Sequence, residues 1–470
     1  MTLTYPPMRL TAAAIALALT LAACTSAGES STVTVTAPVV IAPPQSTAPP
    51  AVSSASALTN STASTNSTAS NVPTASNLPT PIATTAIATT AITTSATKAT
   101  DKSVTSSAAN GTAITTDPEP GATGVSPIAP VVVRATAGKL STVSFTNPVG
   151  KLIPGTYSAD ERTWTSIEPL AYDREYTIDA TATGPAGDIA RTVQFTTVKP
   201  RQTVFPSFFP NPKMKTIGIG QPMVVIFDKA PGDRAAAEKS LTVTTVPAVN
   251  GSWYWWDNRT LHYRPQAYWQ PGTKITVNAK AYGVNFGGGM YGEIDRTLNV
   301  TVGPAKIAKI DDATKKMQVF LNGKLVRTIP VAMGRNQEIT VKGKKISFVT
   351  PSGIYVAQEK YPVRRMSSAT YGLPTTYDLG YDKDIPLAVR ISAGGVFVHS
   401  APWSVADQGV RNVSHGCINI SPDAAKWFYN TFSFGDIVQV TGTSTRLAPT
   451  DGFGDWNIPW SRWQKGSALS

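Results

Sequence analysis

Histidine and cysteine are scarce in this chain: its 470 residues include three histidines and two cysteines. No His-Glu-x-x-His sequence occurs, and the one stretch that holds two histidines and a cysteine has no fourth ligand nearby. Structural zinc sites use four protein ligands and catalytic ones three in a suitable spacing, so this composition argues against a zinc site. We therefore expect no metal and no other cofactor.

The chain also lacks a cluster of Arg and Lys interleaved with aromatic residues, and it contains no recognisable nucleic-acid-binding module. Its formal net charge is +12, yet the basic residues are scattered. We therefore expect no nucleic-acid partner. Attraction to an anionic wall polymer or to a membrane surface is the simpler interpretation of the charge.

No hydrophobic run is long enough to span a bilayer stably. The apolar run Leu10–Ala23 follows a single charge at Arg9 and is typical of a secretory signal peptide, predicted at 1–23. Leu21–Cys24 resembles the lipobox of bacterial lipoproteins, which implies a lipid on Cys24 and an anchor on the outer face of the cytoplasmic membrane, towards the cell wall. The alternative is an ordinary signal peptide followed by a coincidental cysteine.

Residues 24–116 lack aromatic residues and hold almost no charge; they consist mainly of Ser, Thr, Ala, Pro and Val. Such a composition cannot bury a core, so we predict a disordered linker. A flexible chain of this length spans on the order of 50 Å, which would hold the folded part away from the membrane.

From Asp117 onward, short Val-, Thr- and Tyr-rich runs alternate with turn residues. This spacing favours small antiparallel sandwiches, which we predict at 117–199 and 200–303. Similar closing runs begin at Arg191 and Arg296, as in a repeated unit. The predicted fold class is mainly β: two tandem immunoglobulin-like β-sandwiches followed by a β-rich domain with one or two helices.

That third domain is predicted at 304–443. Asn322-Gly323 between two alternating apolar runs predicts a hairpin. Ser421 as N-cap and Pro422 at the first helical position predict a helix to about Tyr429. The extension 444–470 is rich in Trp, Gly and Pro, and we expect it to pack on the folded part.

Two features of the second sandwich are assigned structural rather than functional roles. The aromatic run Trp253–Trp256 is assigned to a core or domain interface rather than to a glycan site, because Trp is usually mostly buried. His262 has no Cys or acidic neighbour at ligand spacing, so we expect a surface or packed strand residue.

The other two histidines, His399 and His415, lie within about twenty residues of Cys417. A thiolate is the nucleophilic form of cysteine, and a histidine in hydrogen-bond reach can take its proton. Gly416 lets backbone N–H groups approach a developing oxyanion. These residues favour acyl transfer by a cysteine without a metal.

His399, fourteen intervening residues and Ser414–Asn419 (Ser-His-Gly-Cys-Ile-Asn) together resemble the active-site pattern of L,D-transpeptidases. The resemblance implies that Cys417 attacks the diaminopimelate carbonyl of a donor tetrapeptide stem and releases D-Ala. His399 would be the general base, oriented by the carbonyl of Ser400. The backbone amides of His415, Gly416 and Cys417 would form the oxyanion region.

The resemblance also implies a lid at 366–381 and carbapenem β-lactams as covalent inhibitors. Packing is the alternative role for the two lid residues Met366 and Tyr371, and the loop 337–345 is interpreted as a solvated turn without a ligand. The implied substrate-binding residues are Met366, Tyr371, Tyr381, Trp403, Ser414 and Asn419.

Three functions stay open on these residues. A transpeptidase would resolve the thioester with the side-chain amine of a second diaminopimelate and form a 3→3 cross-link. The second is another enzyme with the same thioester: an L,D-carboxypeptidase, which would use water, or a protein-attaching transferase, which would use a protein lysine. The third, non-enzymatic possibility is a wall-binding spacer, which the intact cysteine and histidines argue against.

Overall fold

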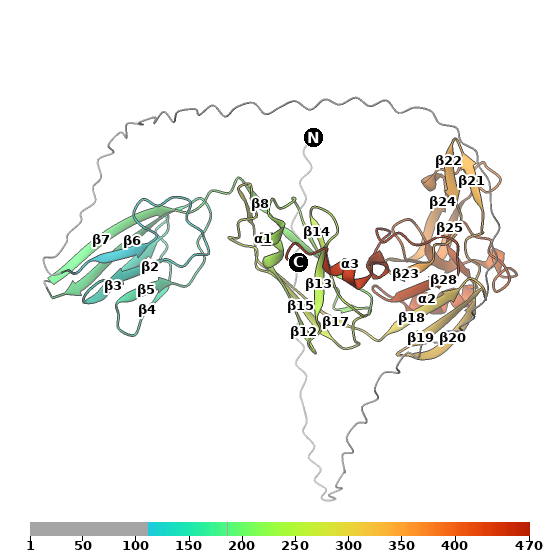
Figure 1. Cartoon of the computed structure of the whole chain (residues 1–470), viewed down its shortest axis with the longest axis horizontal. Coiled ribbons are helices and arrows are strands. Elements are labelled where there is room, and N and C mark those ends of the chain that lie inside the picture. Colours follow the sequence, from blue (N-terminus) through green and yellow to red (C-terminus); the bar gives the residue numbers. More distant parts are fainter. Residues whose placement is uncertain (1–110, 186) are drawn as a thin grey trace, which may run out of the picture. The chain divides into compact units, whose positions relative to one another are not determined.

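The computed structural model describes residues 111–185 and 187–470 (Figure 1). The predicted signal peptide, the lipidation site Cys24 and the linker as far as residue 110 lie outside these residues. Strands dominate the described part, as predicted. Among the described helices, none combines the length and apolar character needed to cross a membrane.

The first sandwich packs a four-stranded sheet, in the order β1-β2-β5-β4, against a three-stranded sheet in the order β3-β6-β7. Alternation along the strands buries one face of each sheet, and Phe145, Trp164 and Phe195 lie in the core between them. Its strands are β1 (Ile114–Asp117), β2 (Val132–Ala135), β3 (Lys139–Thr146), β4 (Gly155–Tyr157), β5 (Thr163–Ser166), β6 (Glu175–Gly184) and β7 (Gly187–Thr196).

The predicted start at Asp117 is wrong by a few residues. Ile114 is buried in the core and pairs with Ala135, so β1 already belongs to the sheet. The run before Asp117 is rich in Thr and resembles the linker in composition, which hid the strand.

The second sandwich packs sheets in the orders β10-β17-β15-β12 and β13-β14-β11-β9, with a short pair β16-β8 at its edge. Its elements are β8 (Gln202–Val204), β9 (Pro206–Phe209), β10 (Thr216–Ile217), β11 (Met223–Phe227), α1 (Arg234–Lys239), β12 (Leu241–Val246), β13 (Gly251–Trp255), β14 (Thr260–Pro265), β15 (Lys274–Ala279), β16 (Met290–Gly292) and β17 (Arg296–Val302).

The third domain contains a five-stranded sheet, β20-β19-β18-β28-β23, and a four-stranded sheet, β24-β25-β26-β27, with a shared apolar core. Its strands are β18 (Lys306–Asp311), β19 (Lys316–Leu321), β20 (Lys324–Pro330), β21 (Glu338–Val341), β22 (Lys344–Ser347), β23 (Gly353–Val356), β24 (Lys360–Ser367), β25 (Asp382–Arg390), β26 (Phe397–Ser400), β27 (Ile418–Ile420) and β28 (Ile437–Thr441). Short 3-10 turns η1 (Ser368–Tyr371) and η2 (Pro402–Ser404) lie beside the four-stranded sheet.

Local chemistry explains the turns and the helix of this domain. Asn322 and Gly323 both have positive φ, as a two-residue hairpin turn requires, and Leu321 pairs with Lys324, which confirms the predicted hairpin. The predicted helix is confirmed as α2 (Pro422–Thr431), whose N-cap Ser421 accepts a hydrogen bond from Ala424 N–H.

The basic segment 342–345 of the loop 337–345 is exposed and contains a turn, as interpreted, but the turn belongs to a hairpin. The loop forms most of the hairpin β21–β22, with Lys342 and Gly343 at positive φ in the turn. Val341 and Ile346 are buried in a small cluster with Phe348 and Leu373. Lys345 faces away from this cluster because it alternates with Ile346 along β22. Lys342 lies in the turn, and the exposed Lys344 donates to Tyr371 O at 3.3 Å.

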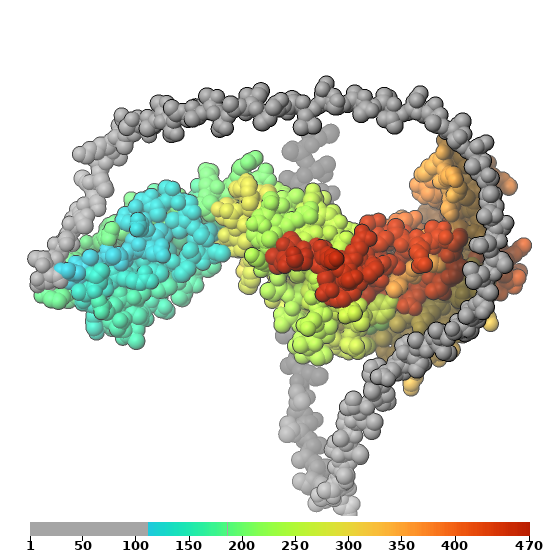
Figure 2. All heavy atoms as spheres, viewed as in Figure 1, coloured from blue at the N-terminus to red at the C-terminus, as the bar shows by residue number. Residues whose placement is uncertain are grey.

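The C-terminal residues pack on the second sandwich, where Figure 2 shows them in red against the yellow-green atoms. They include η3 (Gly454–Asn457) and α3 (Trp460–Gln464). The fully buried Trp463 donates its indole N–H to Ser252 O at 2.9 Å and stacks on Tyr254 at 4.8 Å. The guanidinium of Arg264 lies 4.3 Å from its ring centroid. The C-terminal tail, which follows the last strand of the third domain, therefore packs against the second sandwich.

Trp463→Ala should lower the melting temperature by roughly 6–20 °C. Truncating a buried Trp costs about 3–5 kcal/mol, and about 2–4 °C accompany each kcal/mol in a domain of this size. Differential scanning calorimetry of the full chain measures the shift. Trp403→Ala is the control, since Trp403 is 53 % exposed; equal shifts in both variants would contradict the packing role.

Both structural assignments in the second sandwich, for Trp253–Trp256 and for His262, are confirmed. Trp253 and Trp255 are buried in its core. His262 is a packed strand residue, and its ring stacks on Trp256 at 4.7 Å. Its Nδ1 lies 2.7 Å from Asp455 Oδ1, an acidic partner supplied by the C-terminal tail.

Candidate active site

Two parallel strands bring His399 and Cys417 to one region of the third domain. β26 pairs with β27, and His399 is in register with Asn419. Cys417 directly precedes β27, at the end of the turn Ser414–Gly416. Residues that are eighteen positions apart in sequence are therefore neighbours across one pair of strands.

The segment 332–335 holds both ends of the Ser414–Asn419 loop. Ala332 and Asn419 exchange two backbone hydrogen bonds of 2.9 and 3.0 Å. Ser414 N–H donates to Met333 O at 3.0 Å, and Arg335 N–H donates to Ser414 O at 3.0 Å. The loop is thus hydrogen-bonded to the segment 332–335 both before and after the cysteine.

Ser414 closes the turn from within. Its hydroxyl accepts from Gly416 N–H at 3.1 Å and donates to Cys417 O at 2.6 Å. The predicted oxyanion region of three amides must be corrected, because this bond occupies Gly416 N–H. The amides of His415 and Cys417 are the two that we retain.

His399 is buried and has a defined tautomer. Its Nδ1 lies 2.9 Å from Ser400 O. A carbonyl oxygen only accepts, so Nδ1 carries the proton and Nε2 is the basic nitrogen of the neutral ring. Burial lowers the pKa of His399 to about 4, which keeps the ring neutral at physiological pH.

Cys417 is a free, partly buried thiol. Its Sγ lies 3.6 Å from Gly395 O, and within the described residues no hydrogen bond joins it to His399. Burial raises the pKa of the thiol to about 11. The resting site therefore holds a neutral thiol and a neutral imidazole at physiological pH.

The alkylation rate of Cys417 by iodoacetamide should rise about tenfold per pH unit between pH 7 and 10. With a raised pKa of about 11, only about one thiol in 10⁴ is ionised at pH 7. Intact-protein mass spectrometry follows the reaction, with Cys417→Ala as the unlabelled control. A rate that levels off near pH 6–7 would instead indicate a stable thiolate–imidazolium pair.

A cleft of about 370 Å³ opens over the cysteine and contains eight of the eleven predicted active-site residues. The eight predicted residues that line it are Met366, Tyr381, His399, Trp403, Ser414, His415, Cys417 and Asn419. Ser400, Gly416 and Tyr371 do not line it. Ser400 contacts His399 through its backbone carbonyl, so a position behind the lining fits its predicted role. Gly416 lies behind the lining with its N–H bonded to Ser414, as described above.

Tyr371, a predicted substrate contact, lies outside the lining of the cleft. Its ring packs against the buried cluster that contains Phe348 and Leu373. Its ring centroid lies 6.4 Å from that of Tyr381, which is the residue that reaches the cleft. Its ring packs as in the alternative considered for Tyr371, while its buried hydroxyl has no hydrogen-bond partner among the described residues.

Two polar atoms of cleft residues are buried without a hydrogen-bond partner among the described residues: His415 Nε2 and Asn419 Oδ1. Asn419 Nδ2 donates to Ser404 Oγ at 3.0 Å, which fixes the orientation of its amide. Buried polar atoms are usually paired, so this cleft is built to receive a polar ligand. Burial, and secondarily the charge of Arg335, lowers the pKa of His415 to about 4.

Charged residues at the cleft were missed by the sequence interpretation. Arg335, Lys383 and Asp407 line it. Lys383 lies two residues beyond the predicted lid, so a longer window would have included it. Arg335 is 82 positions from the cysteine, and its Nη2 donates to Val413 O at 2.6 Å; no local pattern marks such a contact.

Comparison with known proteins gives consistent results for the two parts of the chain. A family model described as a bacterial Ig domain matches residues 122–285. A model described as the L,D-transpeptidase catalytic domain matches residues 305–440, which include the whole cleft.

Two relatives from Mycobacterium tuberculosis match most of the chain. L,D-transpeptidase 2 is 42% identical over 349 residues, which cover 74% of this chain and 83% of the relative. L,D-transpeptidase 5 is 36% identical over 362 residues, 76% of this chain and 77% of the relative. A solved L,D-transpeptidase in complex with imipenem is 34% identical, with a TM-score of 0.42 over 50% of this chain and 97% of that one.

Proposed function

Because this chain belongs to the L,D-transpeptidase family, we propose that it is a peptidoglycan L,D-transpeptidase that forms 3→3 cross-links through a Cys417 thioester. The observation that carries the proposal is the placement of Cys417 and His399 in one cleft with unpartnered polar atoms. The substrates are a donor and an acceptor stem peptide.

In the acylation step, Cys417 Sγ attacks the diaminopimelate carbonyl that is bonded to D-Ala. His399 Nε2 takes the thiol proton as the S–C bond forms. The tetrahedral intermediate then collapses, the C–N bond to D-Ala breaks, and the imidazolium returns the proton to the departing amine. A neutral resting pair suits this sequence, because a neutral imidazole accepts a proton and an imidazolium does not.

In the second step, the side-chain amine of an acceptor diaminopimelate attacks the thioester. His399 Nε2 accepts a proton from that amine, and the thiol leaves with the proton when the C–S bond breaks. The new amide joins the two stems. The amides of Cys417 and His415 stabilise the oxyanion in both steps, since donors aimed at developing charge stabilise the transition state most.

The cleft walls supply the substrate contacts of this proposal. Tyr381 and Met366 form one wall, and Trp403, whose ring centroid lies 6.0 Å from that of His399, forms part of another. Asn419 Oδ1 and His415 Nε2 are the polar atoms available to amide groups of the stems. Ser414 shapes the acceptor side mainly by holding the turn.

One incubation separates the functions that share the thioester. The full chain is mixed with a disaccharide-tetrapeptide, and products are identified by mass spectrometry. A cross-linked dimer that has lost one D-Ala supports the proposal. Tripeptide alone indicates an L,D-carboxypeptidase, a stem attached to an added protein indicates a transferase, and no product at all favours a wall-binding spacer.

The setting of the enzyme is part of the same proposal. We propose that Cys24 carries the lipid anchor and that the Ser/Thr-rich linker holds the domains at the outer face of the cytoplasmic membrane. Carbapenems are proposed to acylate Cys417, because a strained β-lactam carbonyl is an acyl donor for the same thiol.

A further inference from the structure

We propose that Thr350 is a positioning residue for acyl transfer, because its hydroxyl holds the peptide between Gly416 and Cys417 in the orientation that aims Cys417 N–H at the oxyanion. The inference rests on the proposed acyl-transfer function and deepens it. Thr350 does not line the cleft and would not touch the substrate.

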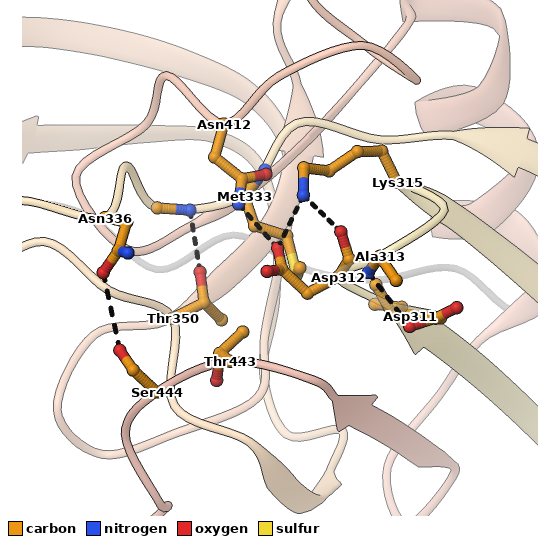
Figure 3. A network of polar contacts seen from close by, with 12 residues as sticks. Asp311, Asp312, Ala313, Lys315, Met333, Asn336, Thr350, Asn412, Thr443 and Ser444 are labelled. Atoms are coloured by element: carbon orange, nitrogen blue, oxygen red, sulfur yellow. Dashed lines mark hydrogen bonds and ion pairs between the residues drawn. The ribbon is translucent and has the colours of Figure 1, made fainter.

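Thr350 lies at the start of the chain that leads into β23 and is completely buried. Figure 3 shows it within a network of polar contacts. Its Oγ1 accepts from Gly334 N–H at 2.9 Å and lies 2.7 Å from Gly416 O. A hydroxyl has one proton, and an N–H can only donate, so that proton goes to Gly416 O.

Fixing this carbonyl fixes the following amide. In a trans peptide the C=O and N–H bonds lie in one plane and point in opposite directions. The hydrogen bond from Thr350 to Gly416 O therefore determines where Cys417 N–H points. This amide belongs to the proposed nucleophile, so it lies beside the carbonyl that the thiol attacks.

The turn needs an external support because its own conformational preference is weak. Gly416 has φ +130°, a region that glycine enters freely and other residues rarely adopt. A glycine in such a turn can rotate its peptide unless partners hold it. Ser414 holds the N–H of Gly416, and Thr350 holds its C=O.

Close packing leaves little room for another arrangement. A Cβ built on Gly334 would lie 1.8 Å from Phe348 O and 2.9 Å from Gly416 Cα. The backbones of residues 334 and 416 are thus nearly in contact, and the Thr350 hydroxyl bridges them.

Asn412 offers a matched control in the same network. It donates to Asp312 Oδ1 at 2.6 Å and accepts from Met333 N–H at 3.0 Å. It therefore supports the segment next to Gly334, as Thr350 does, but makes no hydrogen bond to the Gly416–Cys417 peptide among the described residues. Loss of Asn412 tests general loosening of this region.

The test compares two reactions of Cys417 in the full chain. Acyl transfer builds an oxyanion, whereas alkylation by iodoacetamide does not. Thr350→Val, which keeps the shape and removes the hydroxyl, should lower kcat for the tetrapeptide roughly 10–100-fold while KM and the alkylation rate stay within about twofold. Thr350→Ser should restore kcat, and Asn412→Ala should not separate the two reactions.

Two results would overturn the proposal: an unchanged kcat in Thr350→Val, or an equal loss of acyl transfer and alkylation, which would show a merely structural role. If Thr350→Val does not fold by circular dichroism, Thr350→Ala carries the same comparison. If wild type does not turn over the tetrapeptide, the proposed function fails. The role of Thr350 is then decided with p-nitrophenyl acetate, by comparing how far Thr350→Val slows acylation of Cys417 with how far it slows alkylation by iodoacetamide.

Discussion

Cys417→Ala is expected to lower the rate of cross-linking by roughly 10⁴-fold or more, to the level of the reaction without enzyme. Removing the nucleophile of a cysteine or serine enzyme removes the covalent route altogether, and such losses in related mechanisms are of this size. The measurement is the rate of D-Ala release from a disaccharide-tetrapeptide, with the dimer quantified by mass spectrometry.

The expected loss is chemical rather than structural. Cys417 is partly buried and its thiol makes one long contact of 3.6 Å to Gly395 O, so alanine removes little packing. The variant should therefore melt within about 2 °C of wild type, since small changes of this kind cost little. Equal rates in wild type and Cys417→Ala would contradict the enzyme assignment and leave the spacer function.

His399→Asn should reduce cross-linking at pH 7 roughly 10²- to 10⁴-fold, the usual contribution of a general base. An asparagine amide can take the place of Nδ1–H and donate to Ser400 O, but it has no basic nitrogen in the position of Nε2. The side chain is therefore kept in place while proton transfer is lost.

The pH profile of His399→Asn distinguishes a base from a packing residue. Because burial raises the pKa of Cys417 to about 11, the thiolate fraction keeps increasing with pH up to that value. The variant should regain activity about tenfold per pH unit between pH 7 and 10, whereas wild type should vary little. A parallel profile in both proteins would contradict the role of His399 as base.

The catalytic pair was predictable because it is encoded locally. His399 and Cys417 belong to one short stretch with a defined spacing, and the turn chemistry of Asn322-Gly323 and the capping by Ser421 are likewise local signals. The alternation of apolar residues was enough to predict sandwiches, since a sheet with one buried face needs that pattern.

Contacts between distant segments were not predictable from these patterns. His262 and Asp455 are 193 positions apart, and the partner of His262 comes from a tail whose composition says only that it should be buried. Arg335 and Thr350 reach the active-site loop from across the domain, and neither carries a local pattern that marks the contact. Tyr371 had the residue type expected of a substrate contact, and its ring packs against the buried cluster that contains Leu373.

The Ser414 hydroxyl shows how a side chain can change a backbone prediction. The resemblance to the family implied three oxyanion amides, and the glycine before the cysteine leaves the backbone accessible to an oxyanion. The serine two positions earlier takes one of these amides for the turn itself. Only the three-dimensional path of the loop reveals this competition.

The central claim is that Cys417 forms a thioester with the donor stem. A tetrapeptide whose diaminopimelate side-chain amine is acetylated can act as donor but not as acceptor, so the acyl-enzyme should accumulate. After an acid quench, peptide mapping by mass spectrometry should find Cys417 carrying the donor minus D-Ala, with no adduct in Cys417→Ala. Release of D-Ala without any adduct on Cys417 at the earliest times would contradict the account.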